Sequence, residues 1–307
     1  MRIAVVGAGA MGSLFGGMLA SGGHEVWLID VWREHVEALN KHGIAISGPA
    51  GDRTIPVKAT TNPAEVGPVD LVLIFVKSYD TRLAMLNARP LIEAETTVLT
   101  LQNGLGNVEE ISAAIGQEKV LAGTTAHGAT MLGPGRVRHA GVGETVIGAA
   151  GGGESFRLKS IATVFQSAGI QTHATDDIYS LLWGKLLINA GINALTALTH
   201  LKNGQLLERP EIRALMRDAV LEGAEVARVK GIKLPYPDPV EKVETVARAT
   251  AENKSSMLQD VERGRRTEIN AINGVIYLEG EHLGVPVPVN RVLTLLILGL
   301  KEGGQTG

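Results

Sequence analysis

The first thirty residues read as a strand, a glycine-rich turn, a helix and a second strand, and this order constrains the fold more than any other feature. Arg2–Val6 and Glu25–Ile29 are short apolar runs, and Gly7, Gly9 and Gly12 between them have the spacing G-x-G-x-x-G. In such a turn the first glycine permits a tight bend, the second lets backbone approach a pyrophosphate, and the third lets the helix pack close to the sheet. The phosphates lie at a helix N-terminus, where N–H groups and the helix dipole favour an anion. The pattern predicts half of a dinucleotide site.

The context of this motif matters because the chain contains 38 glycines, so chance matches are expected. Asp30 follows the second strand, about 20 residues after the motif, where an acid can accept hydrogen bonds from ribose hydroxyls. The alternatives are a glycine-rich turn in an unrelated α/β protein, or a signal peptide spanning Arg2 to Ala20. Glycines interrupt the apolar region that a signal peptide needs, so we favour the dinucleotide site.

Composition narrows the class of protein further. A chain of 307 residues with 45% hydrophobic and 20% charged residues is long enough for two globular domains. The net charge of −3 gives no general attraction for nucleic acid or anionic lipid, so neither is an expected partner. The absence of cysteine excludes disulfides, thiolate metal sites and a cysteine nucleophile, and no histidine pattern predicts a metal site. We expect a cytoplasmic protein that does not bind a membrane.

Strands alternate with helices over residues 1–175, which predicts a Rossmann-type doubly wound α/β sheet. Val69–Val76 and Thr96–Leu101 are almost wholly apolar, as strands buried on both faces should be. Lys77 and Asn103 follow these strands. Because open α/β sheets bind ligands outside the carboxyl ends of their strands, both side chains are expected near the nucleotide. Residues 43–57 are expected to form a hairpin or edge strands, and residues 128–139 a hairpin.

Residues 176–307 lack strand signals and predict an all-helical second domain. The predicted helices run from about 178 to Leu198, from Pro210 to about Val229, from the Pro237-Asp238-Pro239 turn to about Thr250, from Thr267 to Leu283, and from Asn290 to Leu300. The segment Asn253–Asp260 reads as an irregular connection.

One of these helices carries a polar stripe. Lys185, Asn189 and Asn193 are spaced i, i+4 and i+8, so they share a helix face, and the residues between them are almost all apolar. A buried ammonium must be partnered, and its pKa can fall toward neutrality, which suits a proton donor. The alternative is a structural lysine whose ammonium reaches the surface while the amides bond to neighbouring helices. Spacing alone does not separate these two interpretations.

Other candidate residues carry weaker signals. Glu268 stands in the first turn predicted for the helix at Thr267, where the helix dipole favours an acid whether or not it has a function. The eight histidines form no recognisable site, and His24 in the turn before the second strand is expected to be structural.

Taken together, these motifs closely resemble the ketopantoate reductase family (2-dehydropantoate 2-reductase). The resemblance covers about residues 1 to 300. It rests on GAGAMG at the N-terminus, Val-Lys77, Gln-Asn103-Gly-Leu-Gly, Trp-x-Lys185 with Asn189 and Asn193, Lys-Asn203-Gly, Ser-Ser256-Met-x-x-Asp, and Arg-x-Thr-Glu268-Ile-Asn. It implies reduction of 2-dehydropantoate to pantoate by hydride transfer from NADPH, a step toward pantothenate and coenzyme A.

The resemblance also implies roles for individual residues. Lys185 matches the proton donor, and Asn103 and Glu268 match positions at the catalytic junction. The matches to cofactor contacts are Gly7, Ala8, Gly9, Ala10, Met11, Gly12, Lys77, Asn103, Ala129 and Glu268. The matches to substrate contacts are Lys185, Asn189, Asn193, Asn203 and Ser256.

The end of the second strand departs from the family pattern. The family commonly has an arginine there for the 2′-phosphate of NADPH, whereas this chain has Asp30, with Arg33 three residues later. The resemblance therefore favours NADPH, while Asp30 favours use of, or preference for, NADH. We further expect a small-molecule 2-oxo acid substrate and a monomer or homodimer. Two alternative functions stay open: reduction of another 2-oxo acid, and a redox sensor that binds a dinucleotide without consuming it.

Overall fold

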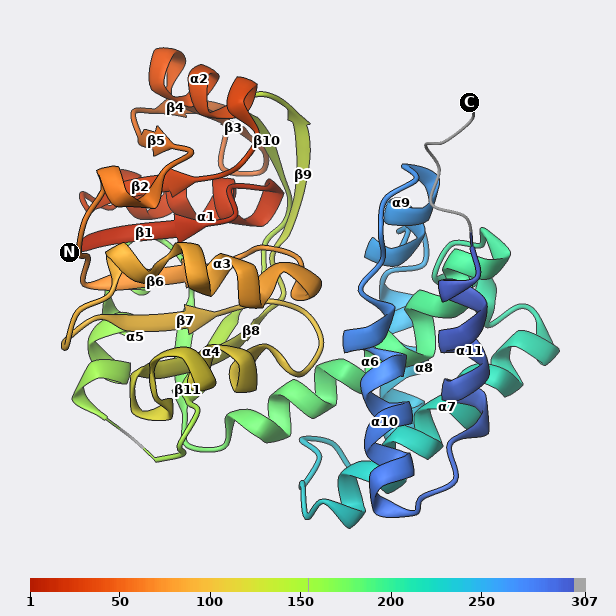
Figure 1. The fold of residues 1–307 in the computed structure, drawn as a ribbon. Coiled ribbons are helices and arrows are strands. Elements are labelled where there is room, and N and C mark those ends of the chain that lie inside the picture. The colour runs from red at the N-terminus through yellow and green to blue at the C-terminus, as the bar shows by residue number, and fades with distance from the viewer. Residues whose placement is uncertain (154, 301–307) are drawn as a thin grey trace. The chain divides into compact units, whose positions relative to one another are not determined.

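The computed structural model describes residues 1–153 and 155–300 and forms two compact units (Figure 1). The sheet unit comprises residues 1–102 and 107–178, and the helical unit comprises 103–106 and the chain from Tyr179 onward. The chain therefore passes from one unit to the other after Gln102, Gly106 and Ile178. The sequence-based boundary at 175/176 lies beside the third of these points, and a single boundary cannot represent the other two.

The sheet unit is built on an eight-stranded sheet with the strand order β12-β11-β8-β7-β6-β1-β2-β5. Neighbouring strands are parallel except β11 and β8, which are antiparallel. The strands are β1 (Arg2–Val6), β2 (Glu25–Ile29), β5 (Lys58–Thr60), β6 (Leu71–Ile74), β7 (Thr97–Thr100), β8 (Val120–Thr125), β11 (Thr145–Ala149) and β12 (Thr172–Thr175). The central strands β6 and β7 are buried throughout, as their apolar sequences predict. The predicted doubly wound α/β fold is confirmed.

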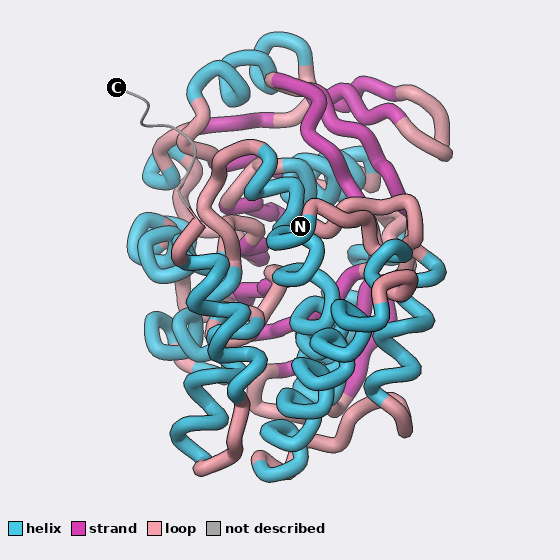
Figure 2. Tube along the Cα trace, turned by 90° about the vertical axis from the view of Figure 1, so that its right-hand side faces the viewer, coloured by secondary structure: helices cyan, strands magenta, loops and turns pink. Residues whose placement is uncertain are grey.

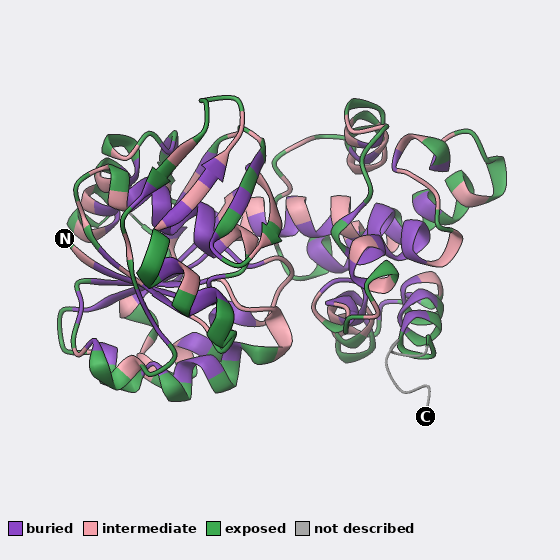
Figure 3. Cartoon of the chain, turned by 90° about the horizontal axis from the view of Figure 1, so that it is seen from above, coloured by how far each residue is buried: buried purple, intermediate pink, exposed green. Residues whose placement is uncertain are grey.

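Helices flank this sheet, and their inner sides are buried while their outer sides are exposed (Figure 3). They are α1 (Ala10–Ser21), α2 (Arg33–His42), α3 (Thr81–Asn87), α4 (Asn107–Ile115) and α5 (Phe156–Ser167). The largest fully buried side chains of this core include Phe15 of α1, Leu28 of β2 and Phe165 of α5.

A second, four-stranded sheet has the order β4-β3-β10-β9. Its strands are β3 (Ile44–Ser47), β4 (Arg53–Ile55), β9 (Gly128–Gly133) and β10 (Arg136–Gly141). Both predicted hairpins exist, and parallel pairing of β3 with β10 joins them into one sheet. Helix α1 packs against both sheets. A Cβ on Gly16 would lie 2.3 Å from Leu28 of β2, and one on Gly17 would lie 2.7 Å from Ile46 of β3. Glycine at these two positions lets the helix pack closely against both sheets, and a larger residue would displace the Leu28 and Ile46 side chains.

The described part of the helical unit contains no strand, and the strands drawn in Figure 2 are those of the two sheets above. Its helices are α6 (Ile178–Thr199), α7 (Pro210–Val229), α8 (Pro239–Ala249), α9 (Ser256–Glu262), α10 (Asn273–Leu283) and α11 (Pro288–Leu298). Helix α6 is long and apolar enough to cross a membrane by composition, but 72% of its most apolar stretch is buried within the structure. It is the core helix of this unit, with Leu187, Ala190 and Ala194 among its buried residues.

Two sequence predictions in the helical unit are wrong. The segment Asn253–Asp260 is not irregular throughout, because α9 begins at Ser256 and is capped by Ser255, whose Oγ accepts a hydrogen bond from the Leu258 N–H. The helix predicted from Thr267 begins only at Asn273, after a short 3-10 turn at Ile269–Ala271. Glu268 therefore precedes that turn and is not a first-turn residue of a long helix.

Candidate active site

The turn between β1 and α1 carries the three glycines of the predicted motif. Gly7 has φ of +93°, and a Cβ there would lie 2.6 Å from the backbone nitrogen of Val76. A Cβ on Gly12 would lie 2.0 Å from the carbonyl oxygen of Gly7. Because real Cβ atoms essentially never come within 3.0 Å of another heavy atom, the packing of the turn itself requires glycine at both positions.

Gly9 differs from these two glycines, because a Cβ there would meet nothing within 4 Å. Gly9 is the N-cap of α1, no side chain caps this helix end, and its first turn contains no acidic residue. Open space beside the N–H groups of a helix N-terminus suits a pyrophosphate. The loop Gly7–Gly12 therefore fits the phosphates of a dinucleotide.

Further predicted cofactor residues follow neighbouring strands. Strand β1 pairs in parallel with both β2 and β6, so Gly7, Asp30 and Lys77 come at the same edge of the sheet. The carboxylate of Asp30 accepts a hydrogen bond from the Trp32 N–H at 3.0 Å, which holds it at the start of α2. Arg33, the first residue of α2, is exposed. An acid and a cation thus lie together where the sequence predicts the ribose.

Ala129 lies in β9, in the second sheet, where it pairs with His139 of β10. Strand β9 packs against α1, the helix that begins at the glycine loop. Ala129 therefore reaches the region of the loop through this helix and not through the main sheet.

The polar stripe of α6 has the orientation that its spacing predicts. Lys185 and Asn189 are partly buried, and Asn193 is buried. Burial lowers the pKa of Lys185 from 10.5 to about 8, while the negative charge of Glu268 acts in the opposite direction. Glu268 is itself buried, with 7% of its surface exposed. An ammonium and a carboxylate from distant parts of the sequence thus interact within the helical unit, and the ammonium releases its proton more readily than a surface lysine does.

Asn103 belongs to the helical unit although it follows strand β7. The next residues dock on the turn after Glu268. The Leu105 N–H donates to the carbonyl oxygen of Ala271 at 3.0 Å, and a Cβ on Gly104 would lie 2.4 Å from the same oxygen. The loop 103–106 therefore brings Asn103 into the unit that holds Lys185 and Glu268. Sequence analysis missed this placement, because the strand pattern alone assigns Asn103 to the sheet.

The remaining predicted substrate residues lie near the ends of other helical segments. Asn203 is 8% exposed; its Nδ2 donates to Thr250 Oγ1 at 2.9 Å, and its Oδ1 has no hydrogen-bond partner among the described residues. Ser256 is the exposed first residue of α9. Its neighbour Ser255 is buried and hydrogen bonded to Thr196 of α6, with 2.7 Å between the two oxygens. This contact holds the start of α9 against Thr196, which lies about one helical turn after Asn193 on α6.

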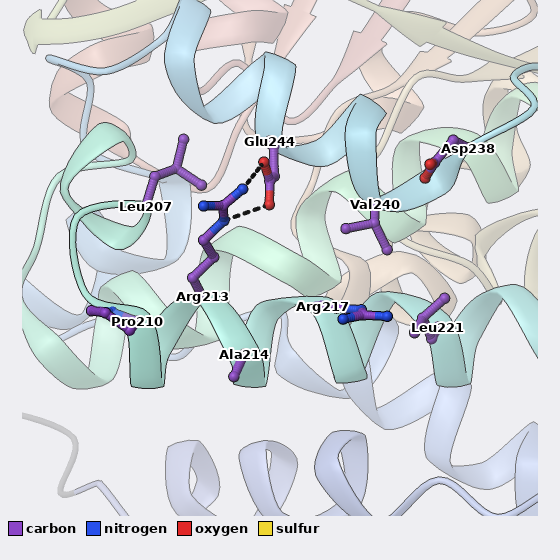
Figure 4. Close-up of a pocket in the computed structure, with 9 residues that line it drawn as sticks. All are labelled: Leu207, Pro210, Arg213, Ala214, Arg217, Leu221, Asp238, Val240 and Glu244. Carbon is purple, nitrogen blue, oxygen red and sulfur yellow. Dashed lines mark hydrogen bonds and ion pairs between the residues drawn. The ribbon is translucent and has the colours of Figure 1, made fainter.

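A hollow of about 580 Å³ lies elsewhere, between α7 and α8 (Figure 4). Arg213 and Glu244 meet there in two hydrogen bonds of 2.7 Å. None of the predicted site residues lines this hollow. Since its two most prominent charges already neutralise each other, we do not assign the reaction to it.

A doubly wound sheet whose first turn fits the phosphates of a dinucleotide, accompanied by a helical unit with a lysine of lowered pKa, is typical of dinucleotide-dependent oxidoreductases. Comparison with known proteins identifies the family. The model for "Ketopantoate reductase PanE/ApbA" matches residues 3–152, and the model for its C-terminal domain matches residues 177–301. The chain belongs to the ketopantoate reductase PanE/ApbA family.

Individual relatives match along their whole length. A 2-dehydropantoate 2-reductase of Halobacterium salinarum is 40% identical over 99% of this chain and 100% of the relative. The crystal structure of a PanE/ApbA family ketopantoate reductase from Ralstonia eutropha JMP134 is 39% identical and superposes with a TM-score of 0.90, covering 97% of each chain. A D-mandelate dehydrogenase solved with NADH and anilino(oxo)acetate is 31% identical, with a TM-score of 0.91 and 97% coverage of each chain.

Proposed function

We propose that this protein reduces 2-dehydropantoate to pantoate with NAD(P)H, as a step of pantothenate and coenzyme A biosynthesis. The observation that carries the proposal is the face of α6 that bears Lys185, Asn189 and Asn193, where burial lowers the pKa of Lys185 to about 8 and the charge of Glu268 acts on its ammonium. Full-length similarity to relatives named 2-dehydropantoate 2-reductase supports the substrate.

The reaction needs a proton donor at the substrate oxygen. The dinucleotide, when bound, supplies a hydride to the 2-oxo carbon, and the former carbonyl oxygen then requires a proton. Lys185 donates it from its ammonium group. Below pH 8 this side chain is mostly protonated, and it loses its proton more easily than an ordinary lysine does. The negative charge of Glu268 favours the protonated form of Lys185, which is the form that can donate a proton. Asn103 holds the carbonyl oxygen by donating a hydrogen bond.

The substrate also has a carboxylate and polar groups that need donors. Asn189 and Asn193 follow Lys185 along α6 at one-turn intervals, and Ser256 begins the helix that Ser255 fixes to α6. The buried Oδ1 of Asn203 has no partner among the described residues, so it can accept a hydrogen bond from a substrate hydroxyl without first breaking another. These side chains together match a small, polar, anionic substrate.

Asp30 and Arg33, which follow β2, determine the preference between NADH and NADPH. Asp30 can accept hydrogen bonds from both ribose hydroxyls of NADH, and its charge repels a 2′-phosphate. Arg33 can offset that repulsion. We propose that NADH is used well and is preferred, in contrast to the NADPH preference implied by the family resemblance. Titration of the purified protein with each dinucleotide, followed by the fluorescence of the reduced nicotinamide, measures the two dissociation constants without turnover.

Turnover assays test the reaction itself. The purified protein should oxidise NADH or NADPH when given 2-dehydropantoate. Absence of turnover with this substrate, together with turnover of another 2-oxo acid, would reject the substrate and keep the reaction class. Dinucleotide binding with no turnover of any 2-oxo acid would instead favour the redox-sensor alternative.

A second candidate substrate is an aryl 2-oxo acid. The similarity to the D-mandelate dehydrogenase solved with anilino(oxo)acetate motivates it, because that protein has a TM-score of 0.91 and 31% identity along nearly the whole chain. The ratio of kcat/KM for 2-dehydropantoate and an aryl 2-oxo acid decides between the two. A ratio above one supports our proposal.

A further inference from the structure

A buried chain of hydrogen bonds connects the phosphate loop to α2 and to the turn between β9 and β10. Ser13 of α1 and His35 of α2 are both 0% exposed. The Gly135 N–H donates to His35 Nδ1 at 2.9 Å, His35 Nε2 lies 3.2 Å from Ser13 Oγ, and Ser13 Oγ donates to the Ala8 carbonyl oxygen at 2.8 Å. The sequence indicates no role for His35, because its hydrogen-bond partners Ser13 and Gly135 are distant in sequence and Gly135 contributes only a backbone N–H.

The direction of every hydrogen bond in this chain is fixed. A backbone N–H can only donate, so His35 Nδ1 must be unprotonated to accept from Gly135. The proton of the neutral imidazole is then on Nε2, which donates to Ser13 Oγ. The Ser13 hydroxyl is left free to donate to the Ala8 carbonyl. Burial lowers the pKa of His35, although the charge of Asp30 and a hydrogen bond to the Ala8 backbone act in the opposite direction. The neutral ring is the form that this arrangement requires.

The contacts of Ser13 and His35 reach two parts of the predicted nucleotide site, the phosphate loop and the segment after β2. Ala8 lies within the phosphate loop, and engagement of its carbonyl oxygen inside the fold keeps that oxygen from facing the phosphates. On the other side, the His35 ring stacks on Trp32, with 5.3 Å between ring centres and 14° between planes. The Trp32 N–H binds the carboxylate of Asp30, the residue proposed to meet the ribose.

We propose that His35 is a positioning residue for the dinucleotide: through Ser13 it holds the phosphate loop, and through Trp32 it holds the segment that carries Asp30 and Arg33. The inference rests on the proposed use of a dinucleotide. It assigns to His35 no contact with the dinucleotide itself and no part in the proton transfer by Lys185.

Two substitutions of His35 separate the two ends of the chain. In His35→Gln the amide nitrogen replaces Nε2 and can still donate to Ser13, whereas in His35→Asn the amide oxygen replaces Nδ1 and can accept only from Gly135. Ser13→Ala removes the link to Ala8 and leaves His35 in place. Dissociation constants for NADH and NADPH are measured by fluorescence, together with KM for each substrate, kcat and the melting temperature.

We expect His35→Asn and Ser13→Ala to weaken dinucleotide binding about tenfold, the usual effect of one lost buried hydrogen bond, with kcat and the KM of the 2-oxo acid within about twofold of wild type. His35→Gln should keep the bond to Ser13 and restore binding to within about threefold, the remaining loss being that of the ring stacked on Trp32. Equal dinucleotide affinity in the two His35 variants would overturn the proposal. A lowered melting temperature with unchanged affinity in Ser13→Ala would also overturn it, since the role would then be structural only.

A measurement on the wild type covers the case in which the His35 variants do not fold. The ¹⁵N chemical shifts of the His35 ring should report an Nε2–H tautomer, and an Nδ1–H tautomer would refute the hydrogen-bond chain. Failure of the proposed function looks different: the wild type would then bind a dinucleotide without oxidising it with any 2-oxo acid, and the dissociation constants of the variants would still test His35. A wild type that binds neither dinucleotide would overturn the inference about His35 as well.

Discussion

The proposed chemistry has two halves, the phosphate loop of the sheet unit and the Lys185 face of the helical unit. The first is formed by backbone groups and the second by side chains. The loop Gly7–Gly12 works through its backbone, and its glycines stand close together in the sequence. The Lys185 site works through side chains, and its partner Glu268 is more than eighty residues away. A backbone site can be recognised from a short motif, whereas a site made of side chains exists only after the unit has folded.

The largest expected effect tests the side-chain site. Replacing Lys185 by Ala should lower kcat by about 10²- to 10⁴-fold, the usual contribution of a positioned acid or base, while dinucleotide affinity stays the same. Lys230→Ala is the matched control, because Lys230 forms a surface ion pair with Glu279 and should change little. Near-normal kcat in Lys185→Ala would remove Lys185 from the role of proton donor.

The pH dependence of the reaction tests the charge of the same site. Because the donor is the protonated form of Lys185, kcat/KM should fall as pH rises through about 8, roughly tenfold per pH unit above it. The carboxylate of Glu268 raises this pKa, so Glu268→Gln should move the decline to lower pH. A pH profile that is flat from 7 to 10 in the wild type would contradict a lysine donor.

A pair of glycine substitutions tests the backbone site. Gly12→Ala should destabilise the fold by about 1–3 kcal/mol because its Cβ would overlap the Gly7 carbonyl. Gly9→Ala should keep the melting temperature of the wild type and still weaken dinucleotide binding roughly tenfold, since its Cβ occupies only the open space. Thermal unfolding and dinucleotide titration measure the two effects. Unchanged affinity in Gly9→Ala would mean that no pyrophosphate lies against this residue.

The smallest expected effect concerns the choice of dinucleotide. Asp30→Ala should raise kcat/KM for NADPH relative to NADH by roughly fivefold, because a charge repulsion near the surface is removed. Arg33→Ala should lower the value for NADPH more than that for NADH. A strong preference of the wild type for NADPH that disappears in Arg33→Ala would show that Arg33, and not Asp30, determines specificity.

The sequence predicted the sheet unit better than the helical unit, and the reasons are local. Strands such as β1 and β2, and helix α7 from Pro210 to Val229, have the bounds that apolar pattern and flanking residues indicate. Tertiary contacts account for what was missed. The pairing of β3 with β10 joins residues ninety positions apart, and no local pattern encodes it.

The interrupted helix after Thr267 has an equally physical cause. In a continuous helix the carbonyl of Ala271 would accept from the N–H four residues later, but here it accepts from Leu105. The backbone departs from helical geometry at Ile272, with φ of −112° and ψ of −94°. By contrast, α9 could have been predicted, because Ser255 is a residue type that commonly begins helices. Lys185, Asn189 and Asn193 were predicted as one face because they share a single helix. The placement of Asn103 in the helical unit depends instead on the docking of the loop 103–106 on Ala271.

The loop 103–106 also determines where the chain can be split into fragments and when the helical unit can finish folding during synthesis. A cut after Ile178 would give a helical fragment without residues 103–106, leaving the Ala271 carbonyl without its donor and the space beside it empty. The helical unit is therefore not encoded by a single contiguous segment. During synthesis, the loop leaves the ribosome more than 160 residues before its docking site at 269–271, so final docking must wait until the chain is nearly complete. Expression of the two halves as separate polypeptides should work only if they reassociate, with the loop supplied by the N-terminal piece.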